Sequence, residues 1–166
     1  MKSLQENMIE YRTQLQKGAI SQAYRGLMQY IMDLRTYLKN KYPDFFVSGS
    51  LYYGYMDMTY FSFFPRTLKN RNLKIAIVFV HETYQFEAWL AGSNRQEQQK
   101  YWQLIKESGW DKYRLVTPGK GVDSILEHVL VADPDFDNLN ALTNRIDQQT
   151  LNFIEDIERF ITDNQI

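Results

Sequence analysis

Two short apolar segments joined by a polar connection constrain the fold of this chain more than any other feature. Residues 75–80 form an unbroken apolar run rich in Ile and Val, which is typical of a central β-strand. Residues 84–90 alternate, so that every second side chain points to the same face of a strand. The short link between the two segments predicts an antiparallel hairpin.

The alternation also predicts the register of this hairpin. One face collects apolar pairs, namely Phe79 with Phe86, Ile77 with Ala88 and Ile75 with Leu90. The other face carries Val78 opposite Glu87, Ala76 opposite Trp89, and Lys74 at its end. A shift by one residue would bury Gln85 and Glu87 in the core, which disfavours any other register. Because Glu82-Thr83 is a poor pair for a two-residue turn, we expect a four-residue turn over 81–84.

Composition places the chain among ordinary globular proteins and excludes several function classes. Its 166 residues are 44% hydrophobic and 23% charged, which predicts a single domain over 1–166. A net charge of −1 predicts no nucleic-acid partner. No apolar run is long enough to span a bilayer or to act as a signal peptide, so we expect a cytoplasmic protein without a membrane partner. The chain has no Cys, which excludes disulfides and thiolate chemistry.

The remaining segments predict an α+β fold. Helical spacing of apolar residues indicates helices over 4–15, 21–40, 122–131 and about 138–162, with Gly18 ending the first and Asp137 capping the last. A further helix over 95–107 is capped by Ser93 or Asn94 and ends at Gly109. Strands are expected over 46–48, 54–64 and, at a sheet edge, 113–116, while 66–72 reads as a solvated loop. The prediction is an antiparallel sheet of four to five strands, with an N-terminal helix hairpin and C-terminal helices mainly on one face.

Three segments carry a resemblance to a known family. They read Ser-Gly-Ser-Leu-Tyr-Tyr-Gly-Tyr-Met-Asp-Met at 48–58, Val-His-Glu at 80–82 and Trp-Leu-Ala-Gly at 89–92. Together they resemble a family of uncharacterised bacterial proteins of this length, over nearly the whole chain. The resemblance implies a bacterial origin and no particular activity, so it transfers no functional residue.

The non-core face of the hairpin is the main candidate site. Glu87, Trp89 and Lys74 share that face, and Asp57 is expected on the neighbouring strand. A carboxylate among aromatic residues loses solvation, so we expect a raised pKa there, and Asp57 with Glu87 could divide acid and base roles. The alternative is that both carboxylates face water and Lys74 neutralises them. With 15% aromatic residues, the chain could build an aromatic-lined pocket or simply an aromatic-rich core.

Other motifs give weaker or negative signals. Arg95 at a helix N-terminus could hold an anion, although simple capping explains the same residues. Residues 117–121 lack the spacing of a phosphate-binding loop, and Trp89 occupies the position where a restriction-type nuclease needs Lys. The two histidines, His81 and His128, lack the spacing of a zinc site. We therefore expect no metal and no cofactor.

The sequence favours a small-ligand-binding or interaction module over an enzyme. Its predicted site residues are Tyr55, Asp57, Lys74, Val78, Glu87, Trp89 and Arg95. Aromatic walls with a few polar groups are typical of small-molecule pockets. One alternative is an enzyme that acts on a small polar substrate with Asp57 or Glu87 as acid or base. Another is a structural subunit whose exposed Trp89 and tyrosines form a homo-oligomer interface.

Overall fold

A computed structural model describes all residues, 1–166. The chain divides into two compact units, residues 1–34 and residues 35–166, each defined by contacts among its own residues. The single domain expected over 1–166 stays a prediction. No helix in the structure combines the length and the apolar character that a bilayer-spanning segment needs.

The first unit contains α1 (Leu4–Gln16) and most of α2 (Ala19–Lys41), the expected N-terminal pair of helices. α1 begins with a capping box, in which Ser3 Oγ accepts a hydrogen bond from the Glu6 amide at 3.1 Å. Gly18 has a φ of +84° just beyond the helix end, as predicted, and α2 follows directly. No residue of α1 is buried.

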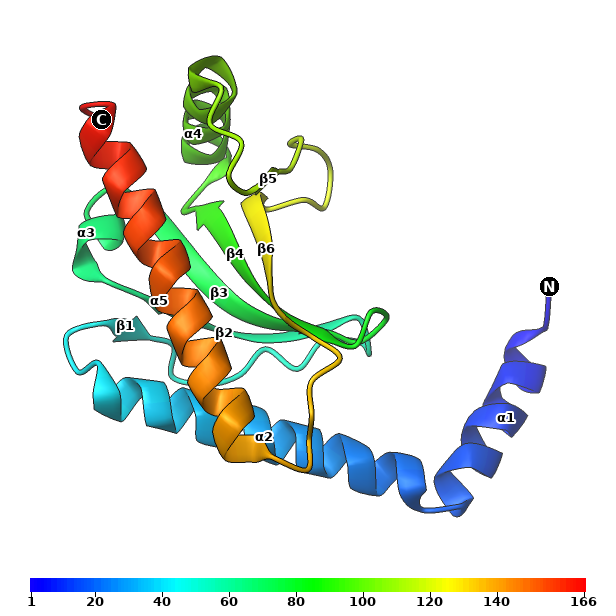
Figure 1. Cartoon of the computed structure of the whole chain (residues 1–166). Helices are drawn as coiled ribbons and strands as arrows, with labels where there is room; N and C mark the ends of the chain where they lie inside the picture. Colours follow the sequence, from blue (N-terminus) through cyan, green and yellow to red (C-terminus); the bar gives the residue numbers. More distant parts are fainter. The chain divides into compact units, whose positions relative to one another are not determined.

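The second unit is built on one antiparallel sheet of six strands (Figure 1). Its order is β1-β2-β3-β4-β6-β5, and its six strands exceed the predicted four to five. The strands are β1 (Phe46–Val47), β2 (Met58–Phe64), β3 (Leu73–Val80), β4 (Gln85–Gly92), β5 (Arg114–Leu115) and β6 (Ser124–Ala132). The short β1 and β5 lie at the two edges, as predicted for the segment around residue 114.

The predicted hairpin is confirmed in every pair. Phe79 pairs with Phe86, and Val78 pairs with Glu87, in an uninterrupted register from Leu73 to Val80. The turn has the expected four residues, and Tyr84 closes it with a φ of +55°. The apolar residues of the core face are all fully buried: Ile75, Ile77, Phe79, Phe86, Ala88 and Leu90.

Helix α5 (Leu139–Asp163) covers this core face, as Figure 1 shows. Phe153 of α5 lies 5.7 Å from the ring of His128, whose partner Ala88 belongs to the core face. Asn138 caps the helix rather than the predicted Asp137, because its side chain accepts from the Ala141 amide.

Helix α4 (Arg95–Ser108) packs against β4 and β6 and begins and ends as predicted. Asn94 accepts a hydrogen bond from the Glu97 amide, and Gly109 ends the helix with a φ of +74°. Near the other end of the core, the buried carboxylate of Asp147 on α5 accepts from Tyr42 at 2.6 Å and pairs with Lys41 at 2.6 Å. These contacts join α5 to the end of α2.

The helix predicted over 122–131 is wrong, because this segment is strand β6. Two β-bulges opposite β4, at Phe86/Glu87 and Leu90/Ala91, interrupt its alternation. Each bulge lets two consecutive residues be buried, first Ile125 with Leu126 and then Leu130 with Val131. The resulting spacing of apolar residues imitates one face of a helix. The segment forms a strand and not a helix because the backbone groups at the free edge of β4 need a partner strand.

Two smaller predictions also need correction. The loop expected over 66–72 contains a short helix, α3 (Arg66–Lys69), whose Leu68 is fully buried. β2 starts at Met58 and not at residue 54, because Gly54 adopts a φ of +77°. A Cβ at Gly54 would lie 2.0 Å from the carbonyl oxygen of Met58, so this close backbone approach requires glycine.

Candidate functional site

The sheet face opposite α5 brings together three of the predicted site residues. Val78, Glu87 and Trp89 lie side by side on β3 and β4, and the register continues from Glu87 to Val129 of β6. Glu87 is only 7% exposed, so the alternative in which its carboxylate faces water is wrong. It is buried on the non-core face, where Val78 is also fully buried and Trp89 is half-buried.

The Glu87 carboxylate is held by its two neighbours on the same strand. The Trp89 indole Nε1 donates to Oε1 at 3.1 Å, and the Gln85 amide Nε2 donates to Oε2 at 3.0 Å. Residues 85, 87 and 89 point to one face because side chains alternate along a strand. Both donors are neutral, and no lysine or arginine forms an ion pair with Glu87.

A cavity of about 590 Å³ opens beside this carboxylate. We call it the Glu87 cavity. It lies over β4 and β6 and beside the segment that leads into β5. Its lining consists of Val80, Thr83, Gln85, Glu87, Trp89, Lys112, Tyr113, Arg114, Glu127, His128 and Val129.

The other charged groups of the lining already have partners of opposite charge. Arg114 lies 3.4 Å from Glu127, which also accepts a hydrogen bond from the Ser124 hydroxyl at 2.9 Å. Lys112 pairs at 2.8 Å with Asp156 of α5, outside the Glu87 cavity. Glu87 is therefore the one lining carboxylate without an ion pair.

Lys112, Tyr113 and His128 line both the Glu87 cavity and a second cavity of about 490 Å³ on the α5 side. Burial lowers the pKa of His128, against the opposing effects of a hydrogen bond to Gln149 and of nearby carboxylates, so its imidazole is neutral at pH 7. Burial and a short hydrogen bond to Asp156 raise the pKa of Tyr113. Burial alone would raise the pKa of Asp156, but Lys112 and Tyr113 lower it. Because the His128 imidazole is neutral at pH 7, it adds no positive charge next to Glu87.

The other predicted residues on or near the hairpin lie outside the cavity. Tyr55 is 89% exposed, and its backbone N–H donates to Asp57 Oδ1 at 2.8 Å. This hydrogen bond lowers the pKa of Asp57, so the expected rise is wrong. The register places Glu87 level with Tyr60 of β2, so Asp57 lies three residues further along and two strands away. Lys74 is exposed and pairs with Ala91, well along β3 from Val78.

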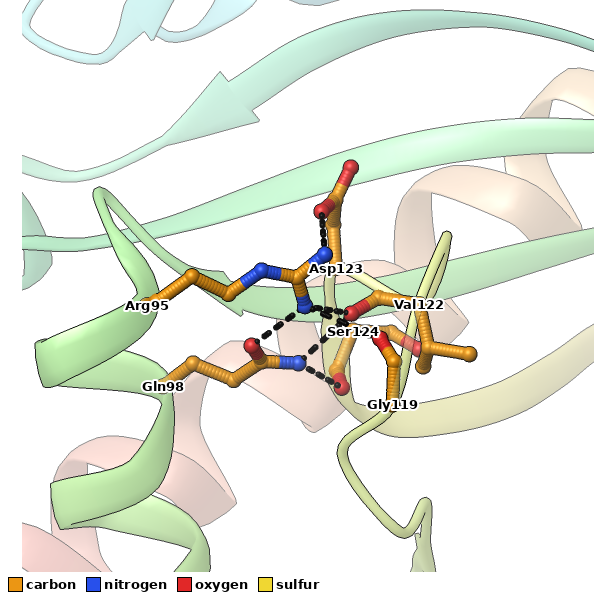
Figure 2. Close-up of polar contacts among 6 residues, drawn as sticks. All are labelled: Arg95, Gln98, Gly119, Val122, Asp123 and Ser124. Atoms are coloured by element: carbon orange, nitrogen blue, oxygen red, sulfur yellow. Dashed lines mark hydrogen bonds and ion pairs between the residues drawn. The ribbon is translucent and has the colours of Figure 1, made fainter.

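Arg95 serves a different contact, which Figure 2 shows. Its guanidinium donates to the carbonyl oxygens of Gly119 and Val122 and lies 3.4 Å from Asp123. It also donates to the side chain of Gln98, at 2.9 Å. These bonds tie the loop before β6 to the start of α4, and Arg95 does not line the Glu87 cavity. Its proposed role in anion binding stays a prediction.

Sequence reasoning missed the half of the cavity that β5 and β6 supply. Lys112, Tyr113, Arg114, Glu127 and His128 all come from these strands or the segment before them. The helix predicted over 122–131 concealed Glu127 and His128. A usable signal was present, since Glu127 and Val129 alternate with His128 within a segment rich in β-branched residues.

Comparison with known proteins gives a family and no activity. No curated protein and no solved structure matches the chain. No group of three or more His, Asp or Glu side chains is arranged to hold a metal ion. Residues 4–161 match a family described as a domain of unknown function, DUF7000, and because this match covers most of the chain, the protein belongs to that family.

Proposed function

We propose that the protein binds a small molecule through a positively charged group that contacts Glu87. The observation that carries this proposal is a carboxylate, 7% exposed, that borders a cavity and has two neutral donors but no cation. Buried charges in proteins are normally paired, because an ion loses its hydration on burial. A ligand ammonium or guanidinium group would supply the missing partner.

The remainder of the Glu87 cavity supports a cationic ligand of metabolite size. Its volume of about 590 Å³ lies within the range of small-molecule sites. Trp89 and Tyr113 add aromatic surface, which attracts cations through the ring quadrupole. Arg114 and Lys112 do not repel such a ligand strongly, because Glu127 and Asp156 compensate their charges.

Binding is better supported than the two alternatives from the sequence. The enzyme hypothesis paired Asp57 with Glu87, and the register separates these two carboxylates by two strands. The oligomer hypothesis needed an exposed Trp89, whereas its indole is half-buried and donates to Glu87. The bacterial origin and the cytoplasmic location stay predictions.

The test compares two probes of nearly the same shape, benzylamine and benzyl alcohol, by isothermal titration calorimetry on the full chain. A charge-assisted hydrogen bond contributes about 1.5–3 kcal/mol, so benzylamine should bind about ten-fold or more tightly than the alcohol. Glu87→Gln keeps the side-chain shape and an acceptor for Trp89 but removes the charge, and it should abolish this preference. Glu107→Gln, at an exposed position on α4, is the matched control and should retain it.

Two results would contradict the proposal. One is equal affinity of the wild-type chain for the amine and the alcohol. The other is a preference for benzylamine that survives in Glu87→Gln, because the cation would then be recognised elsewhere. Agmatine, which carries both an amine and a guanidinium group, is the second probe, and an absence of binding by both cationic probes would also count against the site.

A further inference from the structure

Three connecting segments meet at one end of the sheet. The register places Met58, Val80, Gln85 and Ala132 in one row across β2, β3, β4 and β6. Residues 52–57, 81–84 and 133–138 therefore leave the sheet at the same end. We call this region the aromatic loop surface.

Contacts between the segments confirm that they are neighbours. The His81 amide donates to the Asp57 carbonyl oxygen at 3.0 Å, which joins the first segment to the hairpin turn. The ring of Phe136 lies 6.3 Å from that of Phe79 and 6.4 Å from that of Phe86, next to the turn of the same hairpin. The three segments thus form one continuous part of the molecule.

Exposed apolar side chains are concentrated on the aromatic loop surface. Residues 35–166 contain nine exposed large apolar side chains, and six of them lie in these three segments. The six are Tyr52, Tyr53, Tyr55, Met56, Tyr84 and Phe136. Surface apolar residues are usually scattered, so a concentration of this kind indicates contact with another molecule.

The charge of the same segments is entirely negative. They contain five exposed carboxylates and neither Lys nor Arg. The carboxylates belong to Asp57, Glu82, Asp133, Asp135 and Asp137, and none of them forms an ion pair. The whole chain has a net charge of only −1, so this negative charge is a local property of the surface.

We infer that the aromatic loop surface binds a basic segment of a partner protein, one that carries several Lys or Arg residues. Tyrosine rings attract the cationic side chains and cover their aliphatic parts, while the surrounding carboxylates form charge-assisted hydrogen bonds with them. The negative charge disfavours nucleic acid and anionic lipid as occupants. Each segment also holds one non-glycine residue in the left-handed region, namely Met56, Tyr84 and Asp133.

The test measures fluorescence anisotropy of a labelled ten-residue peptide of alternating Arg and Leu, added to the full-length chain. We expect saturable binding that weakens at higher salt, and no binding of the matching peptide in which Glu replaces Arg. The double variant Glu82→Lys/Asp135→Lys should bind the basic peptide at least ten-fold more weakly. Tyr55→Ala, which leaves the charge unchanged and removes an 89% exposed ring, should weaken binding at least three-fold.

A control variant separates this site from general electrostatic attraction. Asp44→Lys/Glu107→Lys makes the same change in net charge at exposed positions outside the surface, and its affinity should stay within two-fold of wild type. Equal weakening in both double variants overturns the inference, as does failure of the wild-type chain to bind the peptide. Sedimentation provides a second check. A dimer that Tyr55→Ala dissociates would assign the surface to a second copy of the chain and would also overturn the inference.

Discussion

Gln98 makes the most informative stability test, because one buried side chain joins α4 to the loop before β6 (Figure 2). It is only 2% exposed. Its Nε2 donates to the carbonyl oxygens of Val122, at 2.8 Å, and of Ser124, at 3.2 Å. Its Oε1 accepts from Arg95 at 2.9 Å. We predict that Gln98→Ala destabilises the protein more than any substitution of an exposed residue on the same helix.

The magnitude follows from the contacts that the substitution removes. Each of the two lost hydrogen bonds to a backbone carbonyl contributes about 1 kcal/mol net. The void left by the truncated side chain adds about 1 kcal/mol, since the surrounding structure collapses only in part. A total near 3 kcal/mol corresponds to a fall in Tm of about 6–12 °C for a domain of this size.

The assay is urea unfolding followed by circular dichroism, with Gln96→Ala as the matched control. Gln96 lies on the same helix and is exposed, so its substitution removes no buried contact. It should change the free energy of unfolding by less than about 0.5 kcal/mol. If Gln98→Ala costs no more than Gln96→Ala, the hydrogen bonds to Val122 and Ser124 do not hold the loop, and the account of this contact is wrong.

Two further predictions concern pH and packing. Burial lowers the pKa of both His81 and His128 below the usual 6.5, so the unfolded chain binds protons more readily in this range. Stability should therefore be complete above pH 6.5 and fall as the pH drops below it, and urea midpoints of His81→Gln/His128→Gln should be nearly constant between pH 7.5 and 5. Gly92→Ala should lower the free energy of unfolding by about 1–3 kcal/mol, because the new Cβ would lie 2.6 Å from the Gln98 amide nitrogen. A thermal melt equal to that of wild type would show that the chain accommodates it.

Local patterns were sufficient to predict the central hairpin and most helix ends. In residues 75–90 only one register buries the apolar set without burying Gln85, so Phe79 could be paired with Phe86 from the sequence. Caps such as Asn94 and Gly109 lie within a few residues of the backbone groups they satisfy. Because this interaction is local, the helix ends can be predicted from the sequence.

Contacts between distant segments decided the remainder, including most of the candidate site. Residues 124–132 became a strand because β4 had a free edge to pair, and its two bulges gave the segment a helical spacing that no local pattern corrects. The cavity beside Glu87 and the hydrogen bonds of Arg95 to the loop before β6 both involve residues more than 20 positions away, which only folding brings near. The sequence by itself thus determined which face of the hairpin carries Glu87 and Trp89. Only the tertiary structure decided that this face is bordered by β6, because strand pairing between remote segments depends on the assembled sheet.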